Sequence, residues 1–139
     1  MDQYQDESEI ELVVRGFETC ETAGDAFTHA QHLTVGLCYL MEGDEAAALI
    51  RMREGLLRFL ADKGEDLGKY NETITLFWLK LIGQFLKRTE APMTLLDSAN
   101  AVINSFNDSR LVFDYFSEGL LRSEAAKKSW LPPDLKPVE

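Results

Sequence analysis

Hydrophobic residues recur along this chain every three or four positions rather than every second one, which is the spacing of helices with one buried face. The pattern therefore predicts helices throughout and no β-strand. We expect these helices over residues 8–20, 28–43, 44–63, 72–87, 94–105 and 109–121. Turns separate them at Gly24 and Asp25, after Gly64, and at Pro92, which breaks the chain before the fifth helix.

The predicted helix over residues 72–87 differs from the others because it is apolar on two sides. Its two apolar stripes consist of Ile74, Phe77, Trp78, Leu81 and Phe85, and of Leu76, Leu79 and Leu86. A helix that is apolar around most of its circumference is buried between its neighbours. We therefore expect a single all-α domain over residues 1–139, a compact bundle of about six helices around this central helix. The helix over 44–63 is expected to turn its arginines outward.

The two ends of the chain are expected to differ from the bundle. Residues 1–8 are polar and predict a frayed segment. Residues 131–139 contain three prolines, so they predict an extended tail. A short turn over residues 123–128 leads to Trp130, which we expect to dock near the end of the bundle.

The net charge of the chain argues against two classes of binding partner. Among its 139 residues, 24 are acidic and 14 are basic, which gives a net charge of −10. Nucleic acid requires a dense cationic face, and anionic membrane surfaces attract basic segments, so we expect neither as a partner. No run reaches the roughly 18 apolar residues of a membrane-spanning helix.

The N-terminus and the cysteines bear on the compartment. The first residues are acidic where a secretory signal peptide is basic, so we expect no export signal. Cys20 and Cys38 match no metal-binding spacing, and we interpret both as small buried apolar residues. These features together predict a cytoplasmic protein.

The candidate chemistry gathers around two histidines, His29 and His32, whose spacing of three places them as neighbours on one side of a helix. Glu72, near the start of the central helix, projects toward an apolar side, where a carboxylate needs a partner. We therefore predict a site made of these three residues, with Tyr70 or Asn71 alongside. Two histidines and a carboxylate suit zinc or ferrous iron, and a bound water could be activated there for hydrolysis.

Each of these residues also has an ordinary structural interpretation. His29 fits a core histidine that bonds through its ring, Asn71 fits an N-cap, and Glu72 fits a first turn, where the helix dipole favours a carboxylate. Three functions therefore stay open. The chain binds a small ligand or metal in a polar pocket, or it is a non-catalytic protein-interaction module such as a homodimer, or it is a metal-dependent hydrolase.

Three stretches of sequence carry a resemblance to a known family. They are FTHAQHL at 27–33, KYNETITLFW at 69–78, and LLRSEAA at 120–126 with WLPPDL at 130–135. Together they are similar to a family of small, uncharacterised, all-helical bacterial proteins, which brings no established activity. Position 71 is often histidine in that family. Asn71 is a weaker ligand for such metals, so the resemblance implies a lost metal site or an organic ligand in its place.

Overall fold

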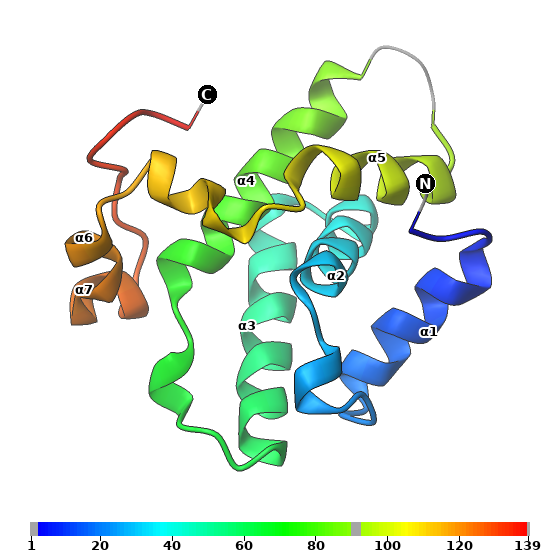
Figure 1. The fold of residues 1–139 in the computed structure, drawn as a ribbon, viewed down its shortest axis with the longest axis horizontal. Helices are drawn as coiled ribbons and strands as arrows, with labels where there is room; N and C mark the ends of the chain where they lie inside the picture. The colour runs from blue at the N-terminus through cyan, green and yellow to red at the C-terminus, as the bar shows by residue number, and fades with distance from the viewer. Residues whose placement is uncertain (1–2, 90–92, 139) are drawn as a thin grey trace.

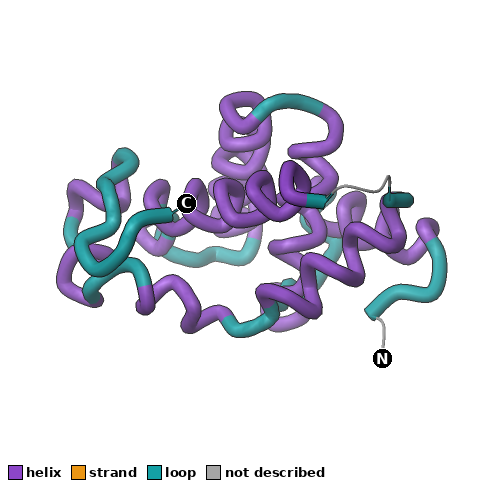
Figure 2. The backbone as a smooth tube through the Cα atoms, turned by 90° about the horizontal axis from the view of Figure 1, so that it is seen from above, coloured by secondary structure: helices purple, strands orange, loops and turns teal. Residues whose placement is uncertain are grey.

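The computed structural model describes residues 3–89 and 93–138, and this part of the chain is helical without any strand (Figures 1 and 2). Its α-helices are α1 (Glu7–Glu18), α2 (His29–Glu42), α3 (Glu45–Asp62), α4 (Glu72–Arg88), α5 (Leu95–Phe106), α6 (Glu118–Arg122) and α7 (Glu124–Lys128). Three 3₁₀ helices join them: η1 (Gly24–Ala26), η2 (Leu67–Lys69) and η3 (Ser109–Asp114). The predicted all-α class is confirmed. None of the described helices is long and apolar enough to cross a membrane.

Side-chain caps explain why the first five α-helices begin where the pattern predicted, within two residues. In each case the side-chain oxygen of the residue before the helix accepts a hydrogen bond from a backbone N–H of the first turn. These caps are Asp6, Thr28, Asp44, Asn71 and Thr94. Gly64 follows α3 with a φ of +69°, the left-handed conformation that suits a glycine after a helix.

The predicted helix over residues 109–121 is wrong. The chain forms η3, then turns at Ser117 and starts the short helix α6. Ser117 has an extended backbone, and its hydroxyl accepts a hydrogen bond from Leu120 N–H at the start of α6. Its own N–H and hydroxyl donate to the Asp134 carboxylate at 2.8 and 2.6 Å, so the C-terminal tail stabilises the extended backbone at Ser117. Residues 124–128, predicted as a turn, form α7, and Pro92 lies outside the described residues.

Helix α4 packs against α2, α3, α5 and α7, as its two apolar stripes predicted. The pattern did not reveal that α2 is just as deeply placed, with every residue from 33 to 39 buried. The two helices approach closely at Gly36, because a Cβ there would lie only 3.3 Å from Leu79 Cδ2 and 3.4 Å from Ile82 Cδ1. A larger residue at position 36 would push α2 away from α4.

Tyr4, in the described part of the segment before α1, is attached to the core, which differs from the expected frayed end over residues 1–8; Met1 and Asp2 lie outside the described residues. Tyr4 is 5% exposed, and its backbone exchanges two hydrogen bonds with the Asn100 amide, at 2.9 and 3.0 Å. Its hydroxyl is 2.8 Å from Thr34 Oγ1. Four polar residues surround this single tyrosine, so the composition of the segment concealed its anchor.

At the other end, Trp130 docks on the bundle as predicted. Its ring packs edge-on against Phe116, with ring centroids 5.9 Å apart, and Lys80 Nζ lies 5.2 Å from its ring centre. Thr73 fixes the backbone on both sides of the ring, because its hydroxyl lies within hydrogen-bonding distance of Ser129 O and accepts from Leu131 N–H. The tail is thereby tied to the first turn of α4.

Candidate functional site

A cavity of about 570 Å³ lies among α2, α3, α4 and η3. Its walls are mainly aromatic and aliphatic side chains, among them Phe27, Leu56, Phe59, Leu60, Trp78 and Phe113. Small-molecule sites in proteins are typically concave, mostly apolar spaces of about 300–1,000 Å³ with a few polar groups at fixed places. This cavity has the size and the lining of such a site.

His29 is one of the polar groups in the cavity wall, where its side chain is half-buried. Its Nε2 lies 2.9 Å from the backbone oxygen of Phe106, the last residue of α5. A carbonyl oxygen can only accept, so Nε2 carries a proton, and in the neutral tautomer with this proton Nδ1 has the lone pair. The ring also meets Trp78 edge-on, with centroids 4.6 Å apart, and both contacts fix its orientation.

His32 is the second imidazole of the cavity wall and is held in the same manner. Its Nδ1 lies 2.9 Å from the backbone oxygen of Thr28, so Nδ1 carries the proton and Nε2 the lone pair. Its ring centroid lies 4.1 Å from that of Phe27. Burial lowers the pKa of His32 below its usual value, so this imidazole is neutral at pH 7.

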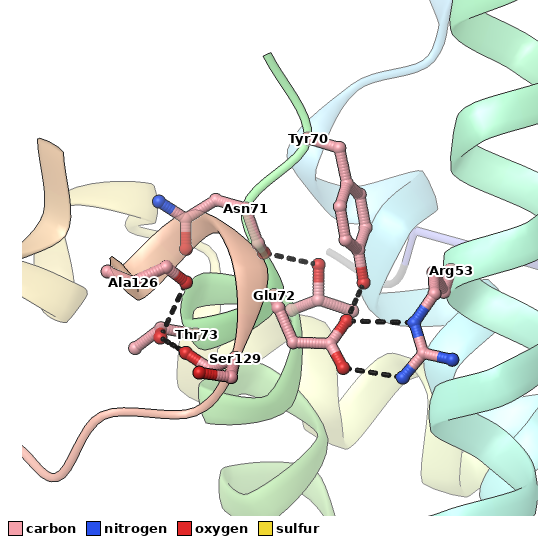
Figure 3. Close-up of polar contacts among 8 residues, drawn as sticks. Arg53, Tyr70, Asn71, Glu72, Thr73, Ala126 and Ser129 are labelled. Atoms are coloured by element: carbon pink, nitrogen blue, oxygen red, sulfur yellow. Dashed lines mark hydrogen bonds and ion pairs between the residues drawn. The ribbon is translucent and has the colours of Figure 1, made fainter. Parts of the chain in front are cut away.

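Glu72, by contrast, is not part of the cavity wall. The residue is buried, and its carboxylate receives two hydrogen bonds from Arg53, Nε at 3.0 Å and Nη2 at 2.5 Å (Figure 3). The Tyr70 hydroxyl donates a third at 2.5 Å. Burial disfavours the carboxylate, but the bonds from Arg53 and Tyr70 outweigh it and hold the pKa of Glu72 below its ordinary value.

The predicted metal set therefore does not come together in the structure. His29 and His32 share the cavity wall, while Glu72 is fully engaged by Arg53 and Tyr70. Across residues 3–89 and 93–138, no group of three or more His, Cys, Asp or Glu side chains could hold a metal ion.

Tyr70 and Asn71 both reach the cavity wall, as predicted, but their polar ends serve the fold. Asn71 Oδ1 accepts from Ile74 N–H at 2.9 Å and caps α4, while its Nδ2 donates to Leu121 O at 2.8 Å. The interpretation of Asn71 as an N-cap is confirmed. Tyr70 donates its proton to Glu72, and burial raises the pKa of its phenol.

The sequence predicts Trp78 as core packing, and it does pack against the buried core, but it also lines the cavity. Phe113, which the sequence did not single out, lines the cavity as well. A signal for Trp78 was present in the spacing, because residues 71, 75, 78 and 82 lie on one side of α4 and all four belong to the wall. Phe113 offered none, since it lies on η3, where the pattern predicted an α-helix.

The charge of the cavity differs from that of the molecule. Among the residues that the structure describes, its wall contains no aspartate or glutamate, and its one formally charged residue is Lys69, which is paired with Glu65. The excess of acidic residues that gives the chain a net charge of −10 lies elsewhere. The cavity is thus an almost neutral space in an acidic protein.

No protein-family model, curated protein or solved structure matches this chain. The geometry of the cavity is therefore the basis for inferring a function.

Proposed function

We propose that this chain binds a small, largely apolar molecule in the cavity among α2, α3, α4 and η3. The observation that carries the proposal is a space of about 570 Å³ whose wall is aromatic and aliphatic except for a few fixed polar groups. The space is partly open to solvent, so a small molecule can enter it from outside.

The polar groups in the wall are preorganised, which supports the same proposal. Each histidine is fixed by a backbone carbonyl on one ring nitrogen and by an aromatic neighbour, Trp78 for His29 and Phe27 for His32. A ligand then does not have to order these side chains, and this lowers the entropic cost of binding.

The two other functions that the sequence left open have weaker support. A metal-dependent hydrolase needs Glu72 as a free carboxylate beside the histidines, and Arg53 and Tyr70 occupy that carboxylate instead. An interaction module or homodimer needs a contiguous apolar patch. Among the large exposed apolar residues of the described chain, Phe113 and Leu135 lie together at a second pocket, whereas the others lie on four different elements: Leu12, Met41, Ile50 and Leu67.

We also propose a cytoplasmic location. Both cysteines are free thiols, as suits a reducing compartment. Cys38 is buried in the core, and burial raises its pKa to about 11, so it is largely protonated at neutral pH.

The proposal is tested by titrating the whole chain with Nile red, an uncharged dye whose emission shifts to the blue in an apolar site. Leu60→Trp places a bulky indole ring in the cavity wall and is expected to weaken dye binding by about tenfold or more. Ile50→Trp makes the same kind of change at a half-exposed position of α3 outside the cavity and serves as the control. Absence of binding, or equal binding by both variants, would contradict the proposal.

A further inference from the structure

We infer that the cavity selects neutral aromatic molecules that carry an O–H or N–H donor, such as phenols and indoles, and that His29 Nδ1 and His32 Nε2 receive those donors. This inference rests on the proposed function and specifies its ligand class. It follows from the hydrogen bonding of the two imidazoles, the charge of the wall and the position of the aromatic rings.

The hydrogen bonding of the imidazoles determines which ring nitrogens can accept a donor from a ligand. Because Phe106 O and Thr28 O each take a ring N–H, both histidines are left with one nitrogen that can only accept. Within the described part of the chain, neither of these two nitrogens receives a hydrogen bond. A ligand that supplies a donor satisfies an acceptor that an apolar ligand would desolvate and leave unpaired.

The charge of the wall is the second step. A cationic ligand would find no carboxylate among the wall residues. An anionic ligand would face two lone pairs, and its one nearby cation, Lys69, is already paired with Glu65. Since burial favours neutral His32, this acceptor keeps its lone pair at pH 7. A neutral donor fits this environment better than either ion.

The aromatic rings are the third step. Phe27 and Trp78 flank the two imidazoles, and Phe59 lies 5.2 Å from Phe27 between ring centroids. A flat aromatic body can stack on these rings or meet them edge-on, which adds to the affinity beyond the effect of the area that it buries. The donors of a phenol or indole lie at the edge of such a body, where an imidazole nitrogen beside the ring can reach them.

Calorimetric titration with three matched compounds tests the inference: 2-naphthol, 2-methoxynaphthalene, which lacks the donor, and 2-naphthoate, which is an anion. We expect 2-naphthol to bind about tenfold more tightly than either of the others, as a paired rather than unpaired acceptor implies. His32→Phe keeps an aromatic ring against Phe27 and removes one of the two acceptors, so it should reduce this preference. The variant leaves no orphan carbonyl, because Thr28 O also accepts the backbone N–H of residue 32.

The outcomes separate this inference from the proposed function. Equal affinity for 2-naphthol and 2-methoxynaphthalene, tighter binding of 2-naphthoate, or an unchanged preference in His32→Phe overturns the inference. If Nile red still binds and Leu60→Trp still weakens it, the ligand-binding cavity stands. If neither Nile red nor any naphthalene compound binds, both are refuted. The melting temperature of His32→Phe shows that the variant is folded.

Discussion

The ion pair between Arg53 and Glu72 provides the sharpest test of how the fold is held beside the cavity. It joins α3 to the first turn of α4 through two hydrogen bonds, and Tyr70 adds a third. Removing one partner of a fully buried pair costs about 3–5 kcal/mol, whereas an exposed pair contributes about 0–1 kcal/mol. The side chain of Glu72 is 10% exposed and that of Arg53 is 38%, so this pair lies between the two limits.

We therefore expect Arg53→Met to lower the free energy of unfolding by about 2 kcal/mol, because it leaves a buried carboxylate with Tyr70 as its one side-chain donor. Glu72→Gln keeps the shape of the side chain and leaves no buried charge, and its expected cost is only about 1 kcal/mol. Once the glutamine is in place, Arg53→Met should cost less than it does in the native chain. This difference is the coupling between the two residues.

Urea denaturation followed by circular dichroism measures all four proteins of this cycle. For a chain of this size, the loss of 2 kcal/mol corresponds to a melting temperature lower by roughly 6–8 °C. Arg122→Met is the matched control, because Arg122 pairs with Glu118 on the surface with its side chain 79% exposed. A cost below about 0.5 kcal/mol for Arg53→Met, similar to that of the control, would refute the reasoning.

The same pair predicts a dependence on pH. Because the pKa of Glu72 is lower in the folded chain than in the unfolded one, its stabilisation is complete above the unfolded value of about 4.3. It is lost as the pH falls through the folded pKa, where the carboxylate becomes protonated. The stability difference between the native chain and Glu72→Gln should therefore be largest near neutral pH and shrink below pH 4. A difference that stays constant between pH 7 and pH 3 would contradict this assignment.

Three further changes are predicted by the packing. Gly55→Ala should lower the free energy of unfolding by about 1–3 kcal/mol, because the new Cβ would lie 2.5 Å from the buried ring of Phe17. Gly83→Ala should stabilise α4 by about 0.5–1 kcal/mol, because nothing lies within 4 Å of its new Cβ. Thermal melts that rank the two variants in the reverse order would contradict this prediction. His29→Ala should cost about 1–3 kcal/mol in urea denaturation, because the last carbonyl of α5 loses its partner, and a fully stable variant would count against that role. Trp130→Ala should expose the chain after α6 to protease, and an unchanged digestion pattern would exclude the docking.

The hydrophobic pattern was sufficient for the first five α-helices because local rules determine them. Each begins at a side chain that caps it, and each has apolar residues at helical spacing. It failed between residues 109 and 121 because a distant residue decides the structure there. Ser117 turns the chain with Asp134, which lies 17 residues further on, and no local window contains both.

The sequence placed most residues of the candidate site correctly, but it did not predict their hydrogen-bond partners. His29, His32, Tyr70 and Asn71 do gather at one cavity, because the pattern placed their helices correctly. The partner of each polar group could not be predicted, since it depends on which helices touch. The sequence indicated that the Glu72 carboxylate needed a partner, and the histidines were predicted to lie beside it. In the structure its partner is Arg53, a residue that was expected to face solvent.

The pairing of Glu72 with Arg53, rather than with the histidines, determines the chemistry of the cavity. On α4, Glu72 lies on the same side as Leu76 and Leu79, and Leu79 belongs to the cavity wall while Glu72 does not. Arg53 pairs with the Glu72 carboxylate, so this carboxylate is not free to bind a metal beside the histidines. Within the described residues, the two histidines lie among aromatic rings rather than beside an unpaired anion. The ion pair that stabilises the fold is thus also what leaves the cavity suited to an uncharged donor.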